Sequence, residues 1–216
     1  MGGEKKRFKD PIYGYIKINK DFVTNFIDTP CFQRLRYITQ TSYSPVYPSA
    51  LHNRFSHSLG VYHLGEIVYT HIELFLKTNK GFKYKKESIK WVENHKNIFL
   101  AACLLHDVGH APFSHTGEKF YETYITDFND IVNDMISRHG NCDFKDIARS
   151  NGESADLHEC MSVYIAFKTF DYYFDGLEAE TKEFFARCIT GYKYKNDELE
   201  LTQIKNCVIE LLNGNL

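Results

Sequence analysis

The most informative part of the 216-residue chain is segment 106–115, HDVGHAPFSH, which directly follows an apolar run at 98–105. The run predicts the last turns of a helix. His106 and Asp107 are adjacent where that helix should end, so an imidazole and a carboxylate can reach one cation from a single rigid element. The pair therefore predicts a metal site.

The residues after this pair predict a turn that faces a substrate. Gly109 and Pro112 break the helix beyond the pair. His110 and His115 fall on the turn that follows, where their side chains could meet a substrate carried by the metal. We predict that both imidazoles take part in the chemistry.

Two further segments carry histidine clusters. Segment 52–57 reads HNRFSH at the start of another predicted helix, and His158-Glu159 starts a later one. Mixed imidazole and carboxylate ligands suit a transition ion such as iron, manganese, zinc, nickel or cobalt, because Mg²⁺ and Ca²⁺ prefer oxygen alone. Arg54 adds a planar cationic fork that is shaped for phosphate oxygens.

Together these groups indicate phosphoester hydrolysis. The metal lowers the pKa of a bound water, the arginine neutralises developing charge, and a histidine protonates the leaving oxygen. A lone His-Asp pair is more often a surface hydrogen bond, but six of the ten histidines fall in the three clusters. The other four stand singly and are predicted to be structural: His63, His71, His95 and His139.

The elements that position these residues are predicted to be mostly α-helical, after a short β arm. Residues 10–18, DPIYGYIKI, alternate apolar and polar types after a proline, which predicts a strand or hairpin. Asp21 is predicted to cap a short helix through Ile27. Thr29-Pro30 is the N-cap and first position of a helix over 32–38.

The rest of the chain follows helical periodicity. The predicted helices cover 56–79, 87–105, 157–170, 178–189 and 201–213. Prolines make 43–48 a predicted loop, and the polar stretch 116–156 predicts short helices and loops.

The composition is that of a folded globular domain. Apolar residues make up 43%, aromatics 15% and charged residues 25%, which excludes a disordered or collagen-like chain. A net charge of −2 does not indicate a nucleic-acid partner. The apolar runs are far shorter than the ~20 residues that cross a bilayer, so we expect a soluble, cytoplasmic protein with no membrane partner. The six scattered cysteines are predicted to be free thiols.

At the histidine clusters the sequence resembles the HD-domain phosphohydrolases. The resemblance rests on His57, on His106-Asp107 about fifty residues later, and on the G-H-x-P-F-S-H pattern after them. A longer run is similar to the deoxynucleoside triphosphate triphosphohydrolases, in the branch that contains the human SAM and HD domain protein. That run comprises DPIYG at 10–14, IDTP at 27–30, FQRLR at 32–36 and HNRFSHSLG at 52–60.

The resemblance implies a single HD-type helical bundle over residues 1–216. It also implies a reaction on nucleotides. The family cleaves a dNTP into a deoxynucleoside and triphosphate, with a divalent transition ion in the protein and Mg²⁺ on the nucleotide. The residues that match three of its four metal ligands are His57, His106 and Asp107.

The resemblance also implies roles for the neighbouring side chains. Arg54 would hold the phosphates and Gln40 would contact the nucleoside. The catalytic set would be His110, His115, His158 and Glu159, with one of the three imidazoles giving the proton to the leaving sugar oxygen.

Regulation is a further implication of the resemblance. In the similar branch, nucleotides also bind an allosteric site between subunits, through residues that match Asp28, Gln33 and Arg36. We therefore expect a homo-oligomer whose activity responds to nucleotide.

One part of the family pattern is missing from the sequence. The fourth ligand is an Asp in a D-x-D-x-x-D-Y segment, which does not occur here. We expect the chain to be the N-terminal part of a longer protein. Two alternatives remain open, namely a nucleotide-binding sensor or interaction module with little catalysis, and a phosphodiesterase that acts on another nucleotide phosphoester.

Overall fold

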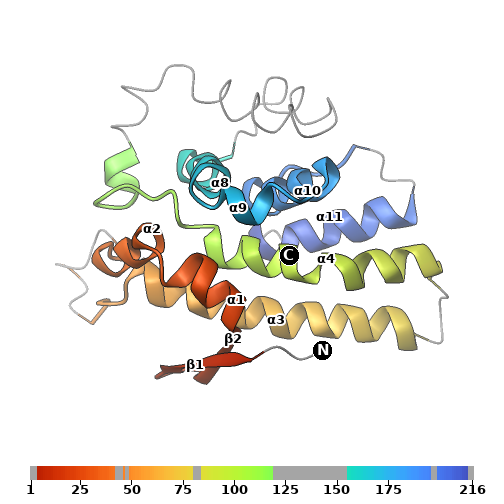
Figure 1. Ribbon diagram of the computed structural model, residues 1–216, viewed down its shortest axis with the longest axis horizontal. Helices are drawn as coiled ribbons and strands as arrows, with labels where there is room; N and C mark the ends of the chain where they lie inside the picture. Colours follow the sequence, from red (N-terminus) through yellow and green to blue (C-terminus); the bar gives the residue numbers. More distant parts are fainter. Residues whose placement is uncertain are drawn as a thin grey trace.

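The computed structural model describes residues 4–41, 46, 49–79, 84–118, 155–195 and 199–213 (Figure 1). Its helices and short N-terminal hairpin confirm the predicted fold class. Most of the predicted loop at 43–48, nearly all of the stretch at 116–156, and His139 lie outside the described residues.

The chain begins with the predicted β arm, which is a hairpin. Strands β1 (Lys5–Asp10) and β2 (Gly14–Asn19) pair antiparallel. The Asp10 carboxylate accepts hydrogen bonds from the backbone N–H groups of Ile12 and Tyr13, at 2.8 and 2.9 Å. Gly14 closes the turn with φ of 73°, a backbone conformation that favours glycine.

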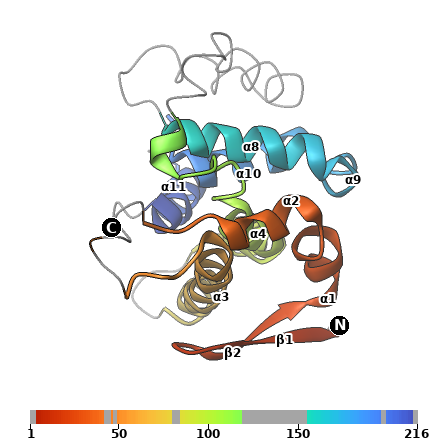
Figure 2. The same ribbon diagram turned by 90° about the vertical axis from the view of Figure 1, so that its left-hand side faces the viewer.

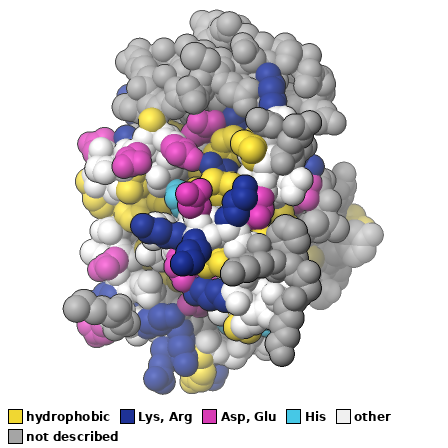
Figure 3. Space-filling model, turned by 90° about the vertical axis from the view of Figure 1, so that its right-hand side faces the viewer, with side chains coloured by type: hydrophobic (Ala, Val, Ile, Leu, Met, Phe, Trp, Pro, Cys, Tyr) yellow, Lys and Arg dark blue, Asp and Glu magenta, His cyan; other side chains and the backbone are white. Residues whose placement is uncertain are grey.

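The hairpin has an apolar inner face and a basic outer face. Ile16 and Ile18 are buried, whereas Arg7 on β1 and Lys17 on β2 are exposed and lie directly opposite each other. Figure 3 shows Lys and Arg side chains gathered at the lower end of the molecule, which is where Figures 1 and 2 place the hairpin. The inner face covers part of the core.

Four short helical segments connect the hairpin to the long helices. They are α1 (Lys20–Phe22), the π-helix η1 (Val23–Ile27), α2 (Pro30–Gln33) and the 3₁₀ helix η2 (Arg34–Tyr37). The predicted Thr29 cap is confirmed, because its hydroxyl accepts the N–H of Phe32 at 3.3 Å. The predicted Asp21 cap is wrong. β2 runs directly into the helix, so the cap position falls on Asn19 and Asp21 lies inside the first turn.

In the parts of the chain that the structure describes, six further helices form the body of the fold. They are α3 (Arg54–Thr78), α4 (Lys86–Leu105), α8 (Leu157–Thr169), α9 (Asp171–Phe174), α10 (Ala179–Thr190) and α11 (Glu200–Asn213). All but α9 were predicted to within two residues at each end. Figures 1 and 2 show α3 and α4 side by side, with α8, α9, α10 and α11 on the side of α4 away from the hairpin.

The C-terminal half of α4 is the centre of the core. Every residue from Ile98 to Leu105 is at most 5% exposed, because α4 packs between α3 and α10. The apolar run that predicted this helix is therefore buried on all sides. Within the described ranges, no helix is both long and apolar enough to cross a membrane.

Candidate functional site

The start of α3 presents two of the predicted site residues. The Asn53 side chain caps this helix by accepting the N–H of Ser56 at 3.0 Å. Arg54 and His57 follow on the first turn, three residues apart, so they lie on the same face of the helix. The helix therefore begins two residues earlier than predicted, and its cap fixes the direction of both side chains.

The end of α4 presents two more of them, His106 and Asp107. The chain leaves the helix at His106 and turns through Asp107 to His110. Arg34, from η2, donates to the backbone carbonyls of His110, at 2.8 Å, and of Val108. These two hydrogen bonds fix the backbone of the turn. The side chains of Asp107 and His110 lie in the site, whereas Val108 belongs to the hydrophobic core.

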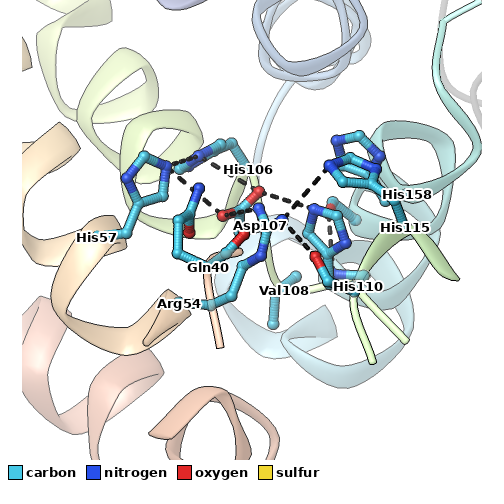
Figure 4. A network of polar contacts seen from close by, with 12 residues as sticks. Gln40, Arg54, His57, His106, Asp107, Val108, His110, His115 and His158 are labelled. Atoms are coloured by element: carbon cyan, nitrogen blue, oxygen red, sulfur yellow. Dashed lines mark hydrogen bonds and ion pairs between the residues drawn. The ribbon is translucent and has the colours of Figure 1, made fainter. Parts of the chain in front are cut away.

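The structure brings His57, His106 and Asp107 together (Figure 4). The two imidazole Nε2 atoms are 3.2 Å apart. The Asp107 carboxylate lies 3.6 Å from the first through Oδ2 and 3.4 Å from the second through Oδ1. The Nδ1 of His106 is 3.0 Å from the carbonyl of Cys103, a contact that places the proton on Nδ1 and leaves the Nε2 lone pair facing the site.

The electrostatic state of this triad suits a metal. Burial, reinforced by the nearby His106, lowers the pKa of His57 to about 4. Burial alone would raise the pKa of Asp107, but His106, a hydrogen bond from His110 and the charge of Arg54 hold it well below its usual range. A neutral imidazole and an ionised carboxylate are the forms that ligate a cation. The donor set of two nitrogens and a carboxylate fits a transition ion.

Arg54 lies in the centre of the site, and two nitrogens of its guanidinium already donate hydrogen bonds within the protein. The side chain is 4% exposed and donates to Asp107 Oδ2 at 2.7 Å and to the Ser114 hydroxyl at 2.5 Å. One of its nitrogens is also 3.5 Å from the Nε2 of His115. In this structure Arg54 therefore orients the carboxylate predicted to be a metal ligand, a contact that the sequence did not indicate.

The predicted catalytic histidines form a second group on the other side of Asp107 (Figure 4). The rings of His110 and His158 stack with centroids 4.0 Å apart, and the His115 ring lies 5.0 Å from each of them. Burial is the main cause that lowers the pKa of His110, and it lowers the pKa of His158 to about 3. Both rings are therefore neutral near pH 7.

Sequence reasoning missed Glu118 and Ser114. The Oε1 atom of Glu118 lies 2.9 to 3.3 Å from the Nδ1 atoms of all three imidazoles in this second group. Burial raises the pKa of this carboxyl. A signal was present, because Glu118 follows His115 by three residues on a helical turn. The sequence held no comparable signal for Ser114, because its contact with Arg54 joins residues sixty positions apart.

Glu159 and Gln40 lie at the margins of the site. The Glu159 carboxylate accepts the backbone N–H of Asp156 at 2.8 Å in the capping box that begins α8, and burial raises its pKa to about 7. The side-chain oxygen of Gln40 is buried and has no hydrogen-bond partner within the described part of the chain, and Figure 4 shows this residue between His57 and Arg54. Its position is compatible with the predicted contact to a nucleoside.

The three predicted allosteric residues lie in or next to α2 and η2. The Gln33 side chain accepts from Arg36 Nε at 2.7 Å and donates to the Ile27 carbonyl at 2.7 Å. Asp28 instead pairs with Lys6 of the hairpin at 3.3 Å. Two of the three residues are therefore in contact, and the third faces β1.

Three of the histidines predicted to be structural make local contacts. His95 stacks on Trp91 with ring centroids 4.1 Å apart, and His63 packs against Tyr13. The Nδ1 of His71 faces the carbonyl of Ile67 at 2.8 Å. None of these three belongs to either histidine group.

Fold and site together define the class of protein. The family model described as "HD domain" matches residues 54–189, which begin at the first residue of α3 and end in α10. This match covers more than half of the chain, and the chain belongs to the HD domain family.

Curated relatives share about half of this chain. The uncharacterized protein YwfO of Bacillus subtilis is 41% identical over 127 residues, which are 58% of this chain and 26% of that protein. The deoxynucleoside triphosphate triphosphohydrolase SAMHD1 of Homo sapiens is 41% identical over 112 residues, which are 51% of this chain and 16% of that protein. The matched region is therefore a small part of either relative.

Solved structures share the fold. A hypothetical protein from Aquifex aeolicus superposes with a TM-score of 0.57 and 27% identity, over 99% of this chain and 43% of that one. A phosphohydrolase from Bacteroides thetaiotaomicron superposes with a TM-score of 0.52 at 24% identity, over 96% of this chain and 38% of that one. The second likeness concerns the fold alone.

Proposed function

We propose that this chain carries the catalytic centre of a metal-dependent phosphohydrolase that cleaves a dNTP into a deoxynucleoside and triphosphate. The observation that carries the proposal is the meeting of His57, His106 and Asp107 beside the buried guanidinium of Arg54. Similarity to a relative named deoxynucleoside triphosphate triphosphohydrolase supports the choice of substrate.

The triad would hold an iron, manganese, zinc, nickel or cobalt ion. Such an ion, when bound, supplies a Lewis acid that lowers the pKa of a water molecule. His106 keeps its Nε2 lone pair toward the site through its contact with the Cys103 carbonyl. Asp107 stays ionised because its Oδ2 accepts a hydrogen bond from Arg54. Both contacts hold the ligand atoms in the orientation and charge state that a cation requires, even in the metal-free protein.

Arg54 and Gln40 would bind the substrate. The guanidinium of Arg54 is held by Asp107 and Ser114, and its Nε has no hydrogen-bond partner among the described residues, so Nε is the donor that would meet a phosphate oxygen. The unpartnered side-chain oxygen of Gln40 would accept a hydrogen bond from the nucleoside. Mg²⁺ would accompany the nucleotide, because oxygen ligands on phosphates suit it.

The histidine group beyond Asp107 would deliver the proton to the leaving oxygen. Burial lowers the pKa values of His110 and His158, whereas the side chain of His115 is 59% exposed and is the one of the three that faces the solvent. We assign the donor role to His115, with Glu118 at 2.9 Å as the group that orients its ring. His110, His158 and Glu159 would support it from the buried side.

We also propose that the chain works as a homo-oligomer with a nucleotide site around Asp28, Gln33 and Arg36. The contact between Gln33 and Arg36 keeps an amide and a guanidinium together, which can recognise a base edge and a phosphate. Activity that is linear in enzyme concentration, unaffected by GTP or dGTP, and unchanged in Asp28→Ala would contradict this regulation.

A second candidate is a nucleotide sensor with weak turnover. It is favoured by the triad itself, because the described residues around it offer three ligands where the family pattern has four. An ion held by three ligands binds more loosely. In that case nucleotide binding would persist while hydrolysis stays low.

Product analysis tests the proposal. The complete protein is incubated with each dNTP and Mn²⁺, and the products are separated by ion-exchange chromatography. We expect a deoxynucleoside and intact triphosphate, with the rate abolished in His106→Ala and unchanged in His95→Ala, whose ring stacks on Trp91 outside the site. Absence of any phosphate product would contradict an enzymatic role. Pyrophosphate or orthophosphate release would indicate another phosphoester bond.

A further inference from the structure

The second histidine group has the composition of a metal site of its own. His110, His115, Glu118 and His158 each offer one ligand atom, and these four atoms lie within 4.8 Å of one another. They come from the turn after α4, the helical turn at 115–118 and the start of α8. Three imidazole nitrogens therefore converge on a single carboxylate oxygen.

The three distances from Glu118 Oε1 to the nitrogens are close to those between ligands of a tetrahedral ion. Glu118 Oε1 lies 3.3 Å from Nδ1 of His110, 2.9 Å from Nδ1 of His115 and 3.1 Å from Nδ1 of His158. Ligands at the usual bond length of about 2.0 to 2.1 Å around a tetrahedral zinc ion are roughly 3.4 Å apart. A shift of a few tenths of an ångström would open the group enough to admit an ion.

The group also contains buried polar atoms that face one another without well-formed hydrogen bonds. Nδ1 of His110, Nδ1 of His158 and Oε1 of Glu118 are buried, and none of them makes a hydrogen bond of good geometry with a residue that the structure describes. The side chain of His110 is fully buried. Such atoms normally have partners in a folded protein, because leaving a buried polar group unpaired costs about 1 to 3 kcal/mol. A cation coordinated at their common centre would satisfy all three.

We propose that His110, His115, Glu118 and His158 form a second, tetrahedral site for a transition ion, with zinc as the best match. Three nitrogens and one oxygen suit zinc, and four protein ligands fill its coordination shell. The site is distinct from the triad of His57, His106 and Asp107. The two are linked through His110, whose Nε2 lies 3.3 Å from Oδ1 of Asp107.

Occupancy of this site has a consequence that rests on the proposed function. An imidazole that ligates zinc through Nδ1 cannot use that nitrogen to relay a proton, and Glu118 can no longer orient the ring of His115. Filling the triad should therefore activate hydrolysis, and filling the second site should inhibit it. The rate should rise and then fall as zinc is added.

Metal binding tests the site without any substrate. The experiment uses His57→Ala, which removes a ligand from the triad and leaves the second site intact, and it titrates this variant with Co²⁺ and Zn²⁺. We expect one ion per chain and the strong visible absorption of tetrahedral Co²⁺. Adding His115→Ala should weaken binding at least about 100-fold, beyond the loss that is usual for removing a supporting contact.

Two further variants show whether loss of the ion is specific to the four proposed ligands. His57→Ala/His95→Ala removes an imidazole that lies outside both groups and should retain the ion. His57→Ala/Glu118→Ala should lose it, and circular dichroism checks that each variant is folded. No ion in folded His57→Ala, or an ion that survives both His115→Ala and Glu118→Ala, would overturn the proposal. Because no nucleotide is present, a wrong proposed function would leave these ion counts unchanged.

Discussion

Arg54 and Asp107 form a buried ion pair that would link the proposed substrate site to the proposed metal site. Their side chains are 4% and 2% exposed, and the contact is 2.7 Å long. A buried charge that loses its partner is strongly destabilising, because no water replaces the lost interaction. Arg54 therefore stabilises the carboxylate, in addition to its proposed contact with a phosphate.

This pair gives a prediction at the residue scale. Arg54→Ala should lower the free energy of unfolding by about 3 to 5 kcal/mol, because it leaves Asp107 buried and unpaired. Urea denaturation of the metal-free protein measures the change. Arg7→Ala, at an exposed position on the hairpin, is the matched control and should change stability by less than about 0.5 kcal/mol. A loss below about 1 kcal/mol for Arg54→Ala would mean that the ion pair is open in solution.

Substitutions of Arg54 and His57 should change the affinities for metal and for nucleotide to different extents. His57→Ala removes a predicted ligand and should abolish metal binding at the triad, whereas Arg54→Ala removes only the group that holds Asp107 and should weaken it about 10- to 100-fold. Arg54→Lys should not restore nucleotide affinity, since an ammonium cannot contact Asp107, Ser114 and a phosphate with one planar fork. Isothermal titration with Mn²⁺ and with dNTP separates the two effects. If Arg54→Ala lost more metal than His57→Ala, the assignment of this pair would be wrong.

At the scale of elements, the site depends on how closely α8 approaches the turn after α4. A Cβ atom added to Gly109 would lie 2.2 Å from the backbone nitrogen of Ser162 and 2.6 Å from the carbonyl oxygen of His158. The N–H of Gly109 also donates to the Ser162 hydroxyl at 2.8 Å. Glycine here lets the two backbones touch, and that contact brings His158 onto His110.

Gly109→Ala should therefore push α8 away from the turn. Overpacking of this kind typically costs about 1 to 3 kcal/mol, and backbone atoms yield less readily than flexible side chains. Thermal unfolding should show the loss, and the variant should also lose the ion proposed to bind the second histidine group. Gly176→Ala, where nothing lies within 4 Å of the added atom, should have little effect. Equal melting temperatures for the two variants would contradict the close approach.

The hairpin gives a second prediction at this scale. Arg7 and Lys17 are directly opposite across the two strands, and like charges in that position are destabilising. Lys17→Glu should stabilise the protein by roughly 0.2 to 1 kcal/mol in low salt, and the gain should shrink in 1 M NaCl because of screening. Arg7→Glu/Lys17→Glu restores a like-charge pair and should show no gain. Urea unfolding at both salt concentrations decides between these outcomes.

The elements were largely predictable because their signals are local. The Thr29 cap and the apolar spacing of α3, α4 and α10 depend on residues within one or two turns, and the structure contains each of them. The π-helix over Val23–Ile27 was not predictable, because its widening depends on packing rather than on propensity.

The site was predictable only where its chemistry follows from residue type. A histidine and an aspartate next to each other at the end of a helix indicate a metal site from residue type and position alone. The roles of Ser114 and Glu118 depend on contacts that reach across the fold to Arg54 and His158. The ion pair of Arg54 was missed for the same reason, since Asp107 is fifty-three positions away in the sequence.

At the scale of the whole molecule, the site is the meeting point of three parts of the chain. The first turn of α3 supplies Arg54 and His57, the turn after α4 supplies His106 and Asp107, and the start of α8 supplies His158. Figure 2 shows these elements in successive layers, with α4 between α3 and α8. Since α4 is the buried centre of the core, the residues at its end are held rigidly, which suits a metal centre.

Anomalous X-ray scattering from crystals saturated with Mn²⁺ tests the central claim most directly. We predict a strong peak between His57, His106 and Asp107, within about 2.0 to 2.2 Å of both Nε2 atoms and of a carboxylate oxygen. The peak should be absent from crystals of His106→Ala grown and soaked in the same way. No peak between these three side chains in the wild-type crystals, or one that remains in His106→Ala, would contradict a metal centre at this place and the hydrolysis proposed to depend on it.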